Sequence, residues 1–212
     1  MTVQQALIAI FQQWGLPKWI KVDNGRPFGD PKTDTIPLLA LWVIGLGMDI
    51  IWNRPRTPQD NAKVERCQGV LNSWVEPLKC KDTVEFQNRL AQEAHFYNYD
   101  FPIRSFGGLK RIERFPTLAH TGREYKPEAF SLQRVLDFVA KGKWQRKVST
   151  NGQINIWGQR FSLGVKFKHQ VLDIKLCPKN NQWIIFDHKG DVIKTETTRI
   201  TENTIKKLDW SK

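Results

Sequence analysis

The alternation of helical and strand patterns in the first hundred residues constrains the fold most. Apolar residues recur at helical spacing over 2–14, and a short apolar run follows at 19–22. A second helix is predicted over 35–47 and a second strand over 49–53. Strands that are separated by helices pair in parallel within one sheet. The sequence therefore predicts an α/β layer with parallel strands.

Two further helices follow this pair of strands. The first is predicted over 61–78, and the second over 83–100. The apolar stripe of the first helix, which we expect to face the core, consists of Val64, Cys67, Leu71, Trp74 and Leu78. Two parallel strands make a poor sheet alone, because parallel sheets need several strands and cover on both faces. We therefore expect this region to be the later part of a larger fold.

The pattern changes to short strands with tight turns from residue 143 onward. Six such runs within 143–200 predict a small β-barrel. An irregular, basic stretch over 101–142, with a short helix at 131–140, is predicted to link this barrel to the α/β region at 1–100. The remaining residues, 201–212, are predicted to form a tail.

Positive charge is concentrated in the second half of the chain. The net charge is +12, yet residues 1–100 carry 11 Lys and Arg against 11 Asp and Glu. Residues 101–212 carry 22 against 10, so the whole excess lies there. This asymmetry favours a polyanion-binding half joined to a neutral half. The alternative is a basic surface that serves only solubility.

The cysteine and histidine content excludes several classes of protein. Cys67, Cys80 and Cys177 are odd in number and lack C-x-x-C spacing, so neither a disulfide framework nor a zinc ribbon is indicated.

The longest apolar run, 38–51, contains Asp49 and is too short to span a bilayer. No signal peptide is evident, so we expect a soluble, intracellular protein without a membrane partner.

Two carboxylates are candidates for chemistry. The run "KWIKVDNGRPFGD" ends its strand at Asp23, where ligands gather in open α/β sheets, although Asn24-Gly25 is also an ordinary turn signal. On the helix at 61–78, Glu65 lies about 140° from the centre of the apolar stripe, at 100° per residue. Glu65 therefore points away from the packed face, and a solvated glutamate is the plain alternative.

These residues sit in motifs that resemble a known family. "VDNGRPF", followed by "RPRTPQDNAKVER", resembles the catalytic core of retroviral-integrase-type transposases, which place an aspartate in a D-N-G-type turn and a glutamate in a P-x-x-N-G/A-x-x-E helix start. The residues that match the second motif are Pro58, Asn61, Ala62, Glu65 and Arg66. "YNYDFPIRSFGG" at 97–108 is similar to the Y-N-x-x-x-P segment of bacterial insertion-sequence transposases.

The resemblance implies a ribonuclease H-like core, present here as its carboxy-terminal part, and a carboxylate triad that holds two Mg²⁺ or Mn²⁺ ions. Two ions about 4 Å apart stabilise the entering and leaving oxygens of an in-line displacement, and hard ions prefer oxygen ligands. Asp23 and Glu65 would be the second and third members. The first is absent, and Asp30, Asp34 and Asp49 are poor substitutes. We therefore expect an amino-terminally truncated transposase.

Candidate DNA contacts fall into two groups. Near the predicted catalytic site, the cations that could hold phosphates are Arg54, Arg56, Lys63 and Arg66. The linker and first barrel strands contribute Arg104, Lys110, Arg111, Arg114, Lys141, Lys143, Arg146 and Lys147. Trp144 and Trp157 could stack on bases, although we favour a place in the barrel core for both.

The sequence thus predicts a transposase or integrase core that cleaves and joins DNA strands. The alternative is a non-catalytic DNA-binding protein derived from a transposase. Expected partners are transposon ends and target DNA, a second copy of the chain, or a complementary transposase segment. The expected compartment is a bacterial-type cytoplasm, in association with the nucleoid.

Overall fold

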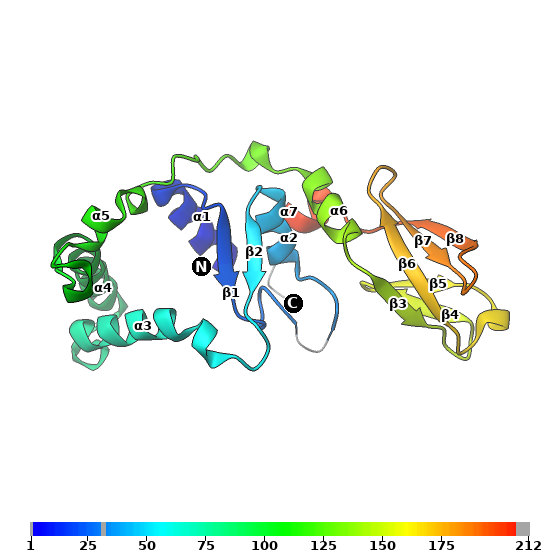
Figure 1. Cartoon of the computed structure of the whole chain (residues 1–212), viewed down its shortest axis with the longest axis horizontal. Helices are drawn as coiled ribbons and strands as arrows, with labels where there is room; N and C mark the ends of the chain where they lie inside the picture. The colour runs from blue at the N-terminus through cyan, green and yellow to red at the C-terminus, as the bar shows by residue number, and fades with distance from the viewer. Residues whose placement is uncertain (1, 31–32, 207–212) are drawn as a thin grey trace. The chain divides into compact units, whose positions relative to one another are not determined.

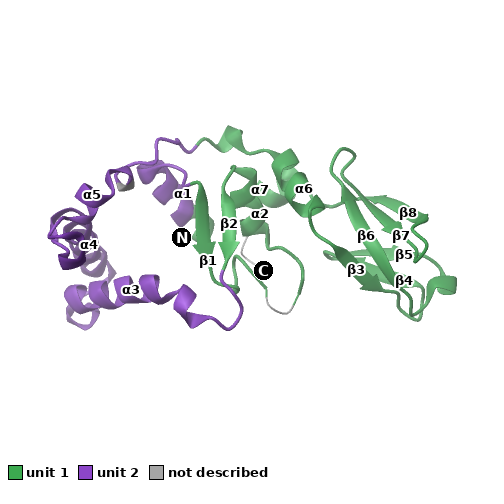
Figure 2. Ribbon diagram, viewed as in Figure 1, with its two compact units in different colours: residues 1–5, 18–52, 126–212 green, residues 6–17, 53–125 purple. Residues whose placement is uncertain are grey.

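The computed structural model describes residues 2–30 and 33–206 (Figure 1). Contacts separate the chain into two units (Figure 2). Unit 1 comprises residues 1–5, 18–52 and 126–212, and unit 2 comprises 6–17 and 53–125. Residues 207–212 of the predicted tail lie outside the described residues.

Unit 1 begins with the two predicted strands, which pair in parallel. Strand β1 (Trp19–Val22) aligns with β2 (Asp49–Trp52), so that Trp19 faces Asp49. Helix α2 (Leu38–Gly45) lies between them in the chain, and this order confirms the predicted parallel pairing. Within the described residues β2 is the one neighbour of β1, and Trp19 is 54% exposed. Strand β1 thus lies at an edge of this two-stranded sheet within the described residues.

Helix α2 forms the centre of unit 1. Every residue from Leu39 to Gly45 is buried, because α2 packs against α6 (Leu132–Ala140) and α7 (Glu202–Lys206). The end of the predicted linker, which precedes and forms α6, thus contributes to this core. The aromatic ring of Phe130 lies so close to Gly45 that a Cβ there would be 2.1 Å from a ring carbon. A helix that is apolar on all sides is buried on all sides.

The six predicted strands beyond residue 143 are all present. They are β3 (Trp144–Lys147), β4 (Gln153–Ile156), β5 (Gln159–Ser162), β6 (Val171–Cys177), β7 (Gln182–Phe186) and β8 (Val192–Thr197). They form an antiparallel sheet in the order β3-β6-β7-β8 and a separate β4-β5 hairpin.

The strand ladders do not close into a barrel within the described residues. Side-chain bonds join the two sheets instead. The amide of Gln159 donates to the carbonyl of Thr197 at 3.1 Å and accepts from the backbone N–H of Arg199 at 2.9 Å. The side-chain amide of Gln159 on β5 thus links the hairpin to the end of β8 and the residues after it.

Three tryptophans form the centre of this β-region. The rings of Trp144, Trp157 and Trp183 meet edge to face, with centroids 5.2–6.3 Å apart. Trp183 is fully buried and Trp144 is buried, while Trp157 is half-buried. The core interpretation is thus confirmed for Trp144. Edge-to-face pairs add to the stabilisation that burial already supplies.

Unit 2 is helical. It contains most of α1 (Val3–Trp14), together with α3 (Ala62–Val75), α4 (Thr83–His95), a π-helical turn at Phe96–Asp100 and the short α5 (Arg111–Arg114). Single 3-10 turns are found at Pro58–Asp60, Pro77–Lys79, Arg104–Phe106 and Pro116–Leu118, and in unit 1 at Pro127–Ala129 and Val165–Phe167.

The predicted apolar stripe of α3 is wrong at both ends. Val64 is 57% exposed, and Leu78 is fully exposed because the helix stops at Val75. Glu76 adopts a left-handed conformation with φ 50°, and Pro77 cannot continue the helix. Helix α4 begins at a good cap, since the carboxylate of Asp82 accepts from the backbone N–H of Glu85 at 2.8 Å.

Candidate functional site

Asp23 follows the last residue of β1, as predicted. Its Oδ1 accepts a hydrogen bond from the backbone N–H of Gly25 at 2.9 Å, and its side chain is exposed. This bond fixes the Asx turn that ends the strand. Oδ2 makes no hydrogen bond within the described residues. The turn therefore holds the carboxylate at the end of the strand and leaves one oxygen open.

Other aspartates in unit 1 differ from Asp23. Asp30 pairs with Arg26 at 3.0 Å, and Asp34 pairs with Arg146 at 2.7 Å. Asp49 lies beside Trp19, at the opposite end of the strand pair from Asp23. Asp23 thus stands at the carboxyl end of β1 without an arginine partner, unlike Asp30 and Asp34.

Glu65 lies in the first turn of α3 in unit 2. It is exposed, as predicted, and within the described residues its carboxylate makes no ion pair or hydrogen bond. The backbone N–H of Glu65 donates to the carbonyl of Asn61 at 3.0 Å. A free carboxylate at a helix N-terminus is stabilised by the helix dipole and remains available to a cation.

The loop before α3 is fixed by two contacts. Asn53 is buried, and its Nδ2 donates to Oδ1 of Asn61. The guanidinium of Arg54 donates to both carboxylate oxygens of Asp60, at 2.9 and 3.2 Å. The hydrogen bond and the charge of Asp60 raise the pKa of Arg54. Because these contacts hold the loop, the start of α3 has a defined geometry.

Asp23 belongs to unit 1 and Glu65 to unit 2. Among the described residues, no three His, Cys, Asp or Glu side chains gather closely enough to hold a metal ion. Carboxylate oxygens are the donors that Mg²⁺ and Mn²⁺ prefer, so the chemistry of both residues fits these ions. A complete site would need at least one further oxygen ligand.

Some of the predicted DNA-binding cations already contact other groups of the chain, and others do not. Three arginines have internal partners. Arg54 binds Asp60, and Arg146 binds both carboxylate oxygens of Asp34 and the carbonyl of Asn155. Arg111 lies 3.2 Å from the centroid of the Tyr97 ring and donates to the Tyr97 carbonyl. These guanidinium groups act first as structural contacts.

The Tyr97 side chain is the centre of this last contact. Burial, together with a hydrogen bond to Cys67, raises the pKa of Tyr97. Trp74 packs edge to face against Tyr97 at 5.9 Å. The segment that contains Tyr97 is thus a packing element of unit 2.

The remaining predicted cations make no ion pair within the described residues, although the Arg114 guanidinium lies over the Phe115 ring, 5.5 Å from its centroid. Arg56, Lys63, Arg66, Lys143 and Lys147 are exposed and make no ion pair. Lys110 is half-buried, and its backbone N–H donates to Glu113 at 2.8 Å. Free cations can bind phosphate without the loss of an existing partner.

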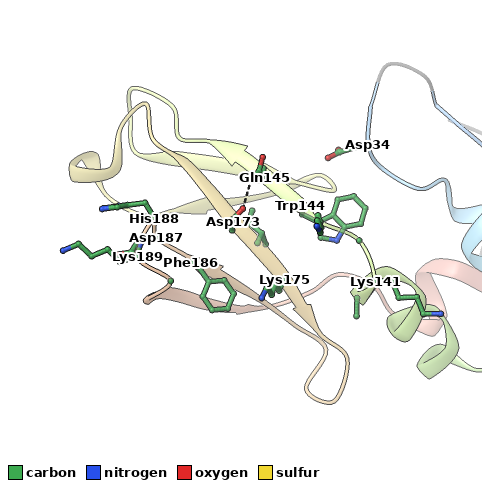
Figure 3. Close-up of a pocket in the computed structure, with 15 residues that line it drawn as sticks. Asp34, Lys141, Trp144, Gln145, Asp173, Lys175, Phe186, Asp187, His188 and Lys189 are labelled. Carbon is green, nitrogen blue, oxygen red and sulfur yellow. Dashed lines mark hydrogen bonds between the residues drawn. The ribbon is translucent and has the colours of Figure 1, made fainter. Parts of the chain in front are cut away.

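A groove of about 1180 Å³ lies on the β-region of unit 1 (Figure 3). The sequence did not predict most of the polar and aromatic residues that line it, which include Gln145, Asp173, Lys175, Phe186 and Lys189. The alternation of "VLDIKLC" at 171–177 carries the signal, since Asp173 and Lys175 point to the face opposite Leu172 and Ile174.

No known protein-family profile matches the chain. Within the described residues, the helices are too short or too polar to cross a membrane.

Proposed function

We propose that this chain forms part of the catalytic core of a DDE-type transposase of the retroviral-integrase type. Such a core cleaves and joins DNA strands with the help of Mg²⁺ or Mn²⁺. The ions would stabilise charge on the entering and leaving oxygens of the phosphodiester. Asp23 and Glu65 would provide oxygen ligands, and the free cations Arg56, Lys63 and Arg66 would hold nearby phosphates. The site would operate in a bacterial-type cytoplasm on nucleoid DNA.

One observation carries this proposal. Both motif carboxylates are exposed and free of arginine partners, whereas Asp30, Asp34 and Asp60 each bind an arginine. Each free carboxylate also stands at the terminus of a regular element, where its backbone position is fixed. An exposed carboxylate that is held in place and has no cationic partner is better suited to bind a metal ion than a carboxylate that already forms an ion pair.

Strand β1 lies at an edge of the two-stranded sheet, and this edge suggests where a further carboxylate would enter. A complementary strand, from a transposase segment or a second copy of the chain, would pair there and bring its own terminal residue beside Asp23. Edge strands accept new strands through their open backbone groups. Without such a strand, we expect the purified chain to be weakly active or inactive.

The test is DNA nicking and joining by the purified chain with Mn²⁺, alone and with a segment translated from the DNA upstream of the Met1 codon. We expect the segment to raise the activity, and Asp23→Asn and Glu65→Gln each to abolish that increase. Asp49→Asn is the matched control and should be harmless. Full activity of both site variants would contradict the proposal.

A non-catalytic DNA-binding role is the second candidate. The lack of a three-ligand metal group among the described residues favours it. In that case Asp23→Asn and Glu65→Gln would leave DNA binding unchanged, and Mn²⁺ would not broaden the amide resonances near either residue.

A further inference from the structure

We infer that the groove on the β3-β6-β7 face binds a single strand of DNA. This inference deepens the proposed action on DNA and rests on it for the choice of DNA as ligand. The groove lies wholly within unit 1. Its walls are the connection after α6 and the turn between β7 and β8, and its floor is the outer face of the sheet (Figure 3).

The charges in the groove are arranged unequally. Its lysines make no ion pair within the described residues; they are Lys141, Lys143, Lys175 and Lys189. The acids in the lining all have partners. Asp34 binds Arg146, and Asp173 accepts from the amide of Gln145 at 2.8 Å. The groove therefore presents unpaired cations to a ligand, while its carboxylates are engaged.

Asp187 is the third acid, and it belongs to the turn. Its Oδ1 accepts from the backbone N–H groups of Asp191 and Lys189, at 2.9 and 2.8 Å. These bonds lower the pKa of Asp187. The carboxylate thus fixes the turn that carries Lys189 and His188 along one wall (Figure 3).

The strand register places the side chains in two rows. Gln145 faces Asp173 on β6, and Asp173 faces Phe186 on β7, so these three form one row straight across the sheet. Lys175 lies two residues further along β6. Trp144, the first residue of β3, faces Ile174. Lys143 and Lys175 each lie one residue beyond this pair in the same direction, and both line the groove as a second, cationic row. Neighbouring rows on one face are about 7 Å apart along the strand.

This order of rows matches a nucleotide chain that lies on the sheet. Phe186 is half-buried, and its ring, over which Lys175 Nζ lies at 5.4 Å from the centroid, is the aromatic surface for base stacking. The Gln145 and Asp173 groups can exchange hydrogen bonds with base edges. The negative charge of Asp173 keeps phosphates off this row and directs them to the lysine row.

A duplex does not fit this face as well. In double-stranded DNA the base faces are stacked inside, so Phe186 would have no base to contact. Sheet faces with a central aromatic residue recognise unstacked bases, and flanking cations follow the backbone. We therefore assign the single strand, and not the duplex, to the groove.

The test is fluorescence anisotropy with a labelled 15-nucleotide single strand and with a hairpin duplex of the same sequence, both in EDTA. We expect the single strand to bind about tenfold more tightly, which reflects stacking of roughly one base. Phe186→Leu keeps an apolar side chain and should remove this preference. Lys175→Gln should reduce the slope of log K against log salt by about 0.7.

Lys179→Gln is the matched control, because Lys179 is exposed in the β6–β7 turn and does not line the groove. It should leave the salt slope unchanged. Equal or tighter binding of the duplex would overturn the inference. So would an unchanged preference in Phe186→Leu, or equal salt slopes for Lys175→Gln and Lys179→Gln. The assay contains no metal, so its failure is distinct from a failure of strand cleavage and joining.

Discussion

The packed regions of unit 1 and the helices of unit 2 carry similar apolar patterns but bury them to different extents. In unit 1, α2 is buried along almost its whole length, and the β-region encloses three tryptophans. Among the described side chains of unit 2, the buried apolar residues are Phe11, Leu16 and Val75. Helix α4 contains no buried residue. An amphipathic pattern thus identifies the apolar face of a helix without saying what covers it.

The largest contrast should come from truncating a buried tryptophan. Trp183 is fully buried and contacts the other two tryptophans of the cluster, so Trp183→Ala should cost about 3–5 kcal/mol of unfolding free energy. Leu78→Ala in unit 2 should cost about 0.5 kcal/mol or less, since Leu78 is fully exposed. Urea denaturation followed by far-UV circular dichroism checks both. Similar losses would contradict the contrast.

A glycine pair tests the same comparison in helices. Gly45→Ala in α2 would place a Cβ against the Phe130 ring, so we expect a loss of about 1–3 kcal/mol from overpacking. Hydrogen exchange of the α2 amides should accelerate accordingly. Restoring space with Phe130→Leu in the same chain should recover part of the loss. No effect of Gly45→Ala would show that α2 and Phe130 are not in contact.

The matching change in α3 should have the opposite sign. Nothing lies within 4 Å of the Cβ position at Gly69, which is in the interior of α3. Gly69→Ala should therefore stabilise the helix by about 0.5–1 kcal/mol, because alanine loses less backbone entropy on folding. Slower hydrogen exchange in α3 is the measurement. A destabilising effect would mean that another segment covers this face.

The smallest predicted effect is the loss of stability at low pH. In unit 1, a hydrogen bond from the backbone N–H of Asp191 lowers the pKa of Asp187. In unit 2, a hydrogen bond from the backbone N–H of Lys81 lowers the pKa of Glu85. A lowered pKa means that each contribution is present above the unfolded-state pKa of about 4 and is lost as the pH falls through the folded value. NMR titration should give a midpoint below the ordinary value for both. A midpoint at or above it would contradict the structure.

The sequence predicts local elements well because their determinants are local. The strand at 19–22, the parallel pair and the six strands after 143 follow from apolar periodicity and turn residues. The exposure of Glu65 follows from its angle on α3. The parallel pairing follows from the order strand, helix, strand. The other properties depend on residues a few positions apart, and the sequence displays them directly.

Properties that depend on distant partners could not be predicted in this way. The pairing of Arg146 with Asp34 joins residues far apart in the chain, and so does the bridge from Gln159 to Thr197. The groove depends on the register of three strands, which places Gln145, Asp173 and Phe186 in one row. No local pattern encodes that register. The sequence showed the excess of positive charge in the second half, but it did not show which of these lysines and arginines lack an ion-pair partner.

The discontinuous course of unit 1 affects how the chain folds during synthesis. Helix α2 leaves the ribosome before the helices that cover it, α6 and α7, which are made only at residues 132–140 and 202–206. Until then its apolar surface has no native partner. Contacts between such distant segments slow folding and prolong the lifetime of aggregation-prone intermediates. We therefore expect the nascent chain to depend on chaperones until α7 has been synthesised.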